Sequence, residues 1–177
     1  MIMIAGSTFP VKFLQQVHGW TTSQIPLLMI LGGALVFGTM ALSGTVADRV
    51  RRRRMLLIGY GLNTVGLLLF YNATGWAVVP GWILMMAGLV ACDVLYGAVG
   101  SELFPTAYRS TASGLRAVAW VGGGALGLQV ESWLYPLTGS HATAITWMAV
   151  GAWIAPLVVL AFIEETASRE LEEITAD

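Results

Sequence analysis

The sequence predicts an all-α membrane protein, and three observations lead to that class. Charged residues make up only 11% of the 177 residues and hydrophobic residues 56%, whereas soluble domains carry roughly 25% charged residues. The apolar residues form stretches close to the roughly 20 residues that a helix needs to cross a bilayer. The charges gather in short runs between these stretches, most strongly at Arg49 and Arg51–Arg54. A soluble fold of this length could not cover its surface with so few charges.

Five apolar stretches qualify as complete membrane-spanning helices. Only helices and closed barrels satisfy their backbone in lipid, and these stretches are too long for barrel strands. We therefore expect a helix in each of them. The expected spans cover residues 25–46, 55–71, 77–101, 111–133 and 142–163.

The two ends of the chain are not predicted to span a membrane on their own. Residues 1–17 are apolar but short and contain Pro10 and Lys12, which indicates a partial helix; a short interfacial helix is the alternative. With the five spans, this segment forms an expected transmembrane bundle over residues 1–163. Residues 164–177 are the one soluble-looking piece, and their apolar residues are spaced as one face of a short helix.

The arginines predict the orientation in a cell membrane, whether inner or plasma membrane. Positive residues stay on the cytoplasmic side, so Arg51–Arg54 place the first loop inside the cell. Alternation of the spans then places the carboxy-terminal tail, residues 164–177, inside as well. Glu131 falls near the outer end of the fourth span, where we expect it at the membrane interface.

The one acidic residue well inside a span is Asp93. An ionisable side chain in lipid is costly and usually faces a cavity or a partner. Asp93 and Tyr96 recur at helical spacing with Gly97 and Gly100, so the four share one helix face. This face is a candidate substrate or proton site. The alternative is a neutral carboxyl group that bonds to a neighbouring helix.

Other classes of function have little support in the sequence. The single cysteine, Cys92, excludes an internal disulfide and a thiolate-based metal site. His18 and His141 lie far apart in sequence and form no ligand pair. Since no nucleophile motif or pair of catalytic carboxylates is evident, we expect no enzyme, no catalytic residue, no metal and no cofactor. With five spans present, the arginine run is not interpreted as a nucleic-acid-binding segment.

Three separated stretches resemble motifs of one transporter family. The first resembles a loop motif of Gly, three residues, Asp, Arg or Lys, any residue, Gly, Arg, and Arg or Lys. The matching residues are Gly44, Asp48, Arg49, Arg52 and Arg53, while Arg51 stands where the family prefers glycine.

The second stretch, residues 101–114, is similar to a pattern of Glu-Leu-Phe-Pro-Thr, two residues, Arg and a later Gly, with Glu102 and Arg109 at the charged positions. The third, residues 165–174, is similar to an ending of Pro-Glu-Thr followed by Arg, any residue and Leu-Glu-Glu-Ile, with Glu164 in place of the proline.

By these motifs the chain resembles the carboxy-terminal half of a major facilitator superfamily transporter, close to metabolite–proton symporters and sugar porters. The resemblance implies that the spans are the eighth to twelfth helices, that residues 1–17 end the seventh, and that an amino-terminal six-helix half is missing from this chain. It also implies an inner gate in which Asp48 faces the start of the eleventh helix, and Arg52 and Arg53 pair with Glu102 or Glu165.

The fourth span matches the family's cavity-lining eleventh helix and carries Arg116 and Trp120 on one stripe. Arg116 is a candidate contact for an anionic substrate; the alternative is that it extends to the inner membrane surface. Trp120 lies deeper in its span than the tryptophans near the outer interface.

The expected function is secondary transport of a small organic solute across the lipid bilayer by alternating access, with protons as a candidate coupling ion. The first span has no hexose-type motif of Gln and Asn, which favours an organic acid or another metabolite over a sugar. A sugar porter remains the alternative. A truncated membrane module that does not transport is the alternative from another class.

Overall fold

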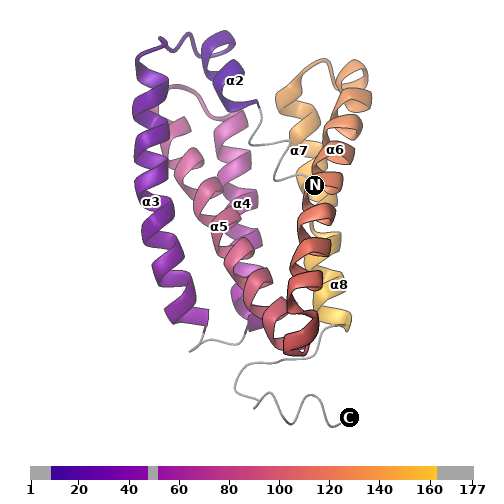
Figure 1. Cartoon of the computed structure of the whole chain (residues 1–177). Helices are drawn as coiled ribbons and strands as arrows, with labels where there is room; N and C mark the ends of the chain where they lie inside the picture. Colours follow the sequence, from indigo (N-terminus) through magenta and orange to yellow (C-terminus); the bar gives the residue numbers. More distant parts are fainter. Residues whose placement is uncertain (1–8, 48–51, 163–177) are drawn as a thin grey trace.

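The computed structural model describes residues 9–47 and 52–162. In these two ranges the regular elements are all helical, joined by short turns (Figure 1). In chain order the α-helices are α2 (Pro10–Gln16), α3 (Gln24–Ala47), α4 (Arg52–Asn72), α5 (Val78–Leu103), α6 (Arg109–Thr138), α7 (His141–Gly151) and α8 (Ile154–Phe162); short 3-10 helices, η1 (Gly75–Ala77) and η2 (Thr106–Tyr108), precede α5 and α6.

The long helices run up and down side by side (Figure 1). Helix α5 is central, because it contacts α3, α4 and α6, while α7 and α8 pack against α4. Helix α2, the start of α3, the α4–α5 turn and the α6–α7 turn lie at one end of the bundle, which we call the α2 end. The end of α3, the start of α4 and the α5–α6 turn lie at the opposite end.

Four of the expected spans are long and apolar enough to cross a membrane. They are Gln24–Ser43, Arg54–Asn72, Gly75–Ala98 and His141–Val158. The expected span at 111–133 lies inside α6, which is 30 residues long but is not among these four in the described part of the chain. Its glycines and its charged residues Arg116 and Glu131 lower its hydropathy, so a count of five spans does not follow from length and composition.

The last expected span is interrupted. The structure places a break at Ala152 and Trp153, between α7 and α8. Pro156 explains the break, because a proline cannot donate a helical hydrogen bond to the carbonyl four residues earlier, and its ring crowds that carbonyl at Ala152.

Helices α4 and α5 approach closely because glycines line their contact. A Cβ atom at Gly81 would come within 2.6 Å of the Phe70 backbone nitrogen, and one at Gly88 within 2.5 Å of the Gly59 carbonyl oxygen. At both positions there is room for the hydrogen atom of glycine but not for a Cβ atom. The buried Asn63 side chain also bonds across this contact, donating through Nδ2 to the Met85 carbonyl at 2.8 Å. The α4–α5 pair therefore forms a tightly joined unit beside the cavity described below.

Two groups of buried apolar side chains hold the bundle together. The larger lies toward the α2 end, where Phe13 and Leu14 of α2 pack on Phe70 of α4, Trp82 of α5 and Ile145 of α7. The smaller lies between α4 and α5. It consists of Met55, Leu56, Tyr60, Cys92 and Leu95.

The α6–α7 turn depends on two residues. Gly139 adopts a left-handed conformation, with φ of 72°, and its backbone nitrogen donates to the Tyr135 carbonyl at 2.9 Å. Glycine takes this conformation without a steric cost. Ser140 then caps α7 by accepting a hydrogen bond from the Thr143 backbone nitrogen at 3.1 Å. The turn sends α7 back along α6 and brings His141 beside it.

Candidate functional site

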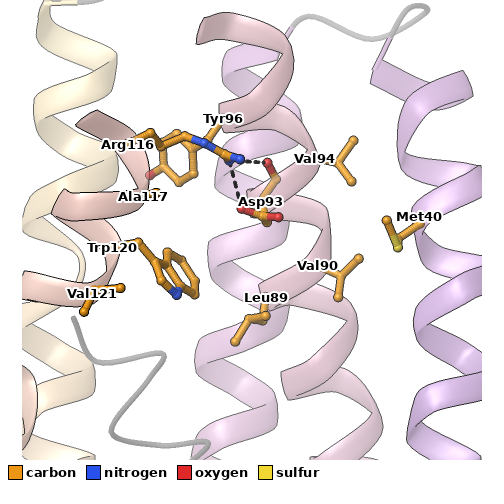
Figure 2. Close-up of a pocket in the computed structure, with 10 residues that line it drawn as sticks. All are labelled: Met40, Leu89, Val90, Asp93, Val94, Tyr96, Arg116, Ala117, Trp120 and Val121. Atoms are coloured by element: carbon orange, nitrogen blue, oxygen red, sulfur yellow. Dashed lines mark hydrogen bonds and ion pairs between the residues drawn. The ribbon is translucent and has the colours of Figure 1, made fainter. Parts of the chain in front are cut away.

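A cavity of about 400 Å³ lies between α3, α5 and α6. Figure 2 shows its lining side chains facing a common space. The residues that line it are Met40, Leu89, Val90, Asp93, Val94, Tyr96, Arg116, Ala117, Trp120 and Val121. The structure therefore brings together all four residues of the candidate substrate or proton site, Asp93, Tyr96, Arg116 and Trp120.

Asp93 and Arg116 form an ion pair across the cavity wall (Figure 2). The Arg116 Nη1 donates to Asp93 Oδ1 at 2.9 Å and to the Asp93 carbonyl oxygen at 3.3 Å. About half of each side chain stays accessible, 47% for Arg116 and 54% for Asp93. A guanidinium has five N–H donors, and both of these bonds use one nitrogen, so Arg116 keeps donors for a ligand.

Aromatic residues form part of the cavity wall. Trp120 is 38% exposed, so part of its indole ring is available for contact. The Tyr96 hydroxyl lies 2.8 Å from the Tyr60 hydroxyl of α4, and the two share a hydrogen bond. This bond connects the cavity wall to the α4–α5 unit.

Sequence reasoning treated Asp93 and Arg116 separately and missed Met40 and Tyr60. Opposite charges at similar depth in two adjacent predicted spans were the available signal for the ion pair. No comparable signal marks Met40, because one methionine among the apolar residues of a span looks like any other.

The residues of the proposed gate are only partly described. Asp48, Arg49 and Glu165 lie outside the described residues. Gly44 lies near the end of α3, Arg52 and Arg53 begin α4, and Glu102 lies near the end of α5. These segments lie at one end of the bundle, opposite the α2 end (Figure 1).

Arg109 is the one gate residue whose side chain is described. It begins α6, and its Nε donates to the Phe104 carbonyl at 3.2 Å. It thereby closes the turn between α5 and α6, at the same end of the bundle as the other gate segments.

Glu131, which we expected near the outer end of its span at the membrane interface, is buried within the bundle. Its side chain is only 4% exposed and pairs through Oε1 with Nδ1 of His141. The α6–α7 turn brings His141 back over Glu131, and Phe9 stacks on the histidine ring with 5.0 Å between ring centroids. The separation of the two residues in sequence hid this pair.

Among the described residues, no group of three or more His, Cys, Asp or Glu side chains could hold a metal ion. The charged groups of the central cavity are instead one carboxylate and one guanidinium. Together with the aromatic and aliphatic lining, they fit a small solute with a charged group and an apolar body.

Comparison with known proteins gives one positive result. The family model described as Major Facilitator Superfamily matches residues 1–176. No curated protein and no solved structure matches the chain. The match covers almost the whole sequence and agrees with the apolar helices. The chain therefore belongs to the Major Facilitator Superfamily, a family of membrane transporters of small solutes, and is a multi-pass membrane protein.

Proposed function

We propose that this protein carries a small organic acid across the cell membrane by alternating access, with Arg116 as the anion-binding group and Asp93 as the proton-binding group. The observation that supports this most is the Asp93–Arg116 ion pair, half-exposed in a cavity of about 400 Å³. A charge pair at membrane depth is costly to keep and commonly marks a substrate or ion pathway.

The ion pair suggests how an anion and a proton could bind together. An incoming carboxylate competes with Asp93 for Arg116, because a guanidinium binds either carboxylate with charge-assisted hydrogen bonds. A proton that binds the displaced Asp93 carboxylate would offset the charge of the incoming anion. Each solute anion that enters would therefore bring one proton, and the loaded site would keep the net charge of the empty one.

The lining of the cavity favours an organic acid over a sugar. Six of the ten lining residues have wholly apolar side chains. A sugar would leave several hydroxyl groups without partners against such a wall, and an unpaired buried polar group costs about 1–3 kcal/mol. A solute with one carboxylate and an apolar body avoids that cost.

The family motifs support a further proposal about the assembly. The chain acts as the carboxy-terminal half of the transporter, and an amino-terminal six-helix half supplies the other wall of the cavity. The Arg51–Arg54 loop and the carboxy terminus then face the cytoplasm, where the gate residues Asp48 and Glu102 would close the inner side. Transport arises when the two halves rock around the cavity between them.

Flux measurements test the proposed function. The chain is reconstituted into vesicles alone and with its amino-terminal half, and uptake of labelled benzoate, lactate and glucose is followed with and without an inward proton gradient. We expect saturable uptake of an acid that needs both halves and is stimulated by the gradient. Uptake of glucose but of neither acid would favour the sugar porter. No uptake of any solute, with or without the amino-terminal half, would favour a module that does not transport.

A further inference from the structure

A second cavity, of about 170 Å³, lies at the α2 end between α2 and the α6–α7 turn. It shares no lining residue with the central cavity. The rings of Phe9, Phe13 and Tyr135 form one part of its lining, and Lys12, Gln16, Ser140 and His141 supply polar groups. An aromatic wall beside a cationic side chain is suited to a small aromatic anion.

The His141 ring is held in place from several sides. Its Nδ1 bonds to Glu131, a carboxylate with only 4% of its side chain exposed. Phe9 lies at 5.0 Å with 18° between the ring planes, and Tyr135 at 4.3 Å, both measured between ring centroids. Because Nδ1 is engaged by Glu131, Nε2 is the ring nitrogen left for a molecule in the cavity.

Charged and aromatic groups surround His141. Glu131 and Tyr135 face it from α6, Lys12 shares the cavity with it from α2, and Tyr71 of α4 interacts electrostatically with Glu131. Protonated His141 keeps its bond to Glu131 and donates through Nε2 as well. Neutral His141 with its proton on Nδ1 presents a lone pair at Nε2, which repels an anion.

We propose that this cavity is a peripheral binding site for a small aromatic carboxylate, which binds between Lys12 and protonated His141 with its ring against Phe9, Phe13 and Tyr135. Two charge-assisted hydrogen bonds would orient the carboxylate. The site is distinct from the Asp93–Arg116 cavity, and its occupancy does not require transport.

Calorimetric titration of benzoate into the full chain in lipid nanodiscs tests this site, with uncharged benzamide as the comparison ligand. We expect benzoate to bind at least about tenfold more tightly than benzamide, because only the carboxylate can pair with both Lys12 and His141. Lys12→Gln and His141→Gln should each weaken benzoate binding by about tenfold.

Two control variants separate this site from the rest of the protein. His18→Gln changes the other histidine, which does not line the cavity, and Arg54→Gln removes an exposed arginine at the start of α4 that does not line it either; both should keep the benzoate affinity. Lys12 is exposed, so Lys12→Gln should fold normally even if His141→Gln does not. Absence of benzoate binding, or binding that Arg116→Gln removes while Lys12→Gln leaves it intact, would overturn the proposal; in the second case the benzoate occupies the central cavity instead.

Discussion

Replacing Arg116 by glutamine is expected to reduce solute uptake by about tenfold to a hundredfold while the protein stays in the membrane. The change removes the cation that holds the solute carboxylate and leaves Asp93 without its 2.9 Å partner. A hydrogen bond to a charged group contributes about 1.5–3 kcal/mol, and about 1.4 kcal/mol corresponds to a factor of ten in rate. Uptake of the labelled acid, normalised to the amount of protein in the membrane, measures the effect.

Two further variants make this result specific. Arg54→Gln removes an exposed arginine at the start of α4, outside the cavity, and should leave uptake close to wild type. The double variant Asp93→Arg with Arg116→Asp keeps an ion pair but moves the cation from α6 to α5. It should therefore restore the amount of protein in the membrane more fully than it restores uptake. Wild-type uptake by Arg116→Gln would show that the ion pair only joins α5 to α6.

Replacing Gly88 by alanine is expected to destabilise the bundle by forcing α4 and α5 apart. The added Cβ would lie 2.5 Å from the Gly59 carbonyl oxygen and 2.7 Å from the Asn63 Cα atom. Both are backbone atoms, so the clash is relieved only by separating the two helices. Overpacking of this kind typically costs about 1–3 kcal/mol. Urea unfolding of the purified chain in detergent, followed by circular dichroism, measures the loss.

Gly61→Ala on α4 is the matched control, because a Cβ atom there meets no atom within 4 Å. Alanine is the better helix former by about 0.8–1 kcal/mol, so this variant should be as stable as wild type or slightly more so. Equal stability of the Gly88 and Gly61 variants would mean that α4 and α5 are not packed as closely as the structure places them.

The sequence was sufficient to predict the helical class, the family and the approximate limits of α3, α4 and α5. Their apolar runs are uninterrupted and end at charged residues or turn residues, which fixes the ends to within a few residues. The resemblance to the major facilitator superfamily is confirmed by the family match over residues 1–176. Helix α6 was harder, because its glycines and charged residues make it less apolar than the other long helices.

The candidate site was predictable as a set of residues but not as a geometry. Helical spacing placed Asp93 and Tyr96 together on one face of α5. It placed Arg116 and Trp120 together on one face of α6. Whether those faces meet depends on how α5 and α6 rotate about their axes, and hydropathy carries no information on rotation. The burial of Glu131 was not predictable for a related reason, since it depends on Phe9 and His141, which come from two other segments of the chain.

The most direct test of the central claim is whether the cavity between α5 and α6 holds water in the membrane. Cys92 is the only cysteine of the chain, so Cys92→Ala gives a background in which one new thiol can be followed, provided that the amino-terminal half is also free of cysteine. Val94 lines the cavity, while Val65 is 50% exposed on α4 away from it.

Vesicles of both orientations that contain both halves are treated with a charged thiol reagent that does not cross membranes. Such reagents attack the thiolate, which forms in contact with water and not in lipid. The account predicts that Val94→Cys reacts from at least one side and is protected by a transported acid, whereas Val65→Cys reacts from neither side. A Val94→Cys thiol that stays unreactive from both sides would contradict a solute site at Asp93 and Arg116.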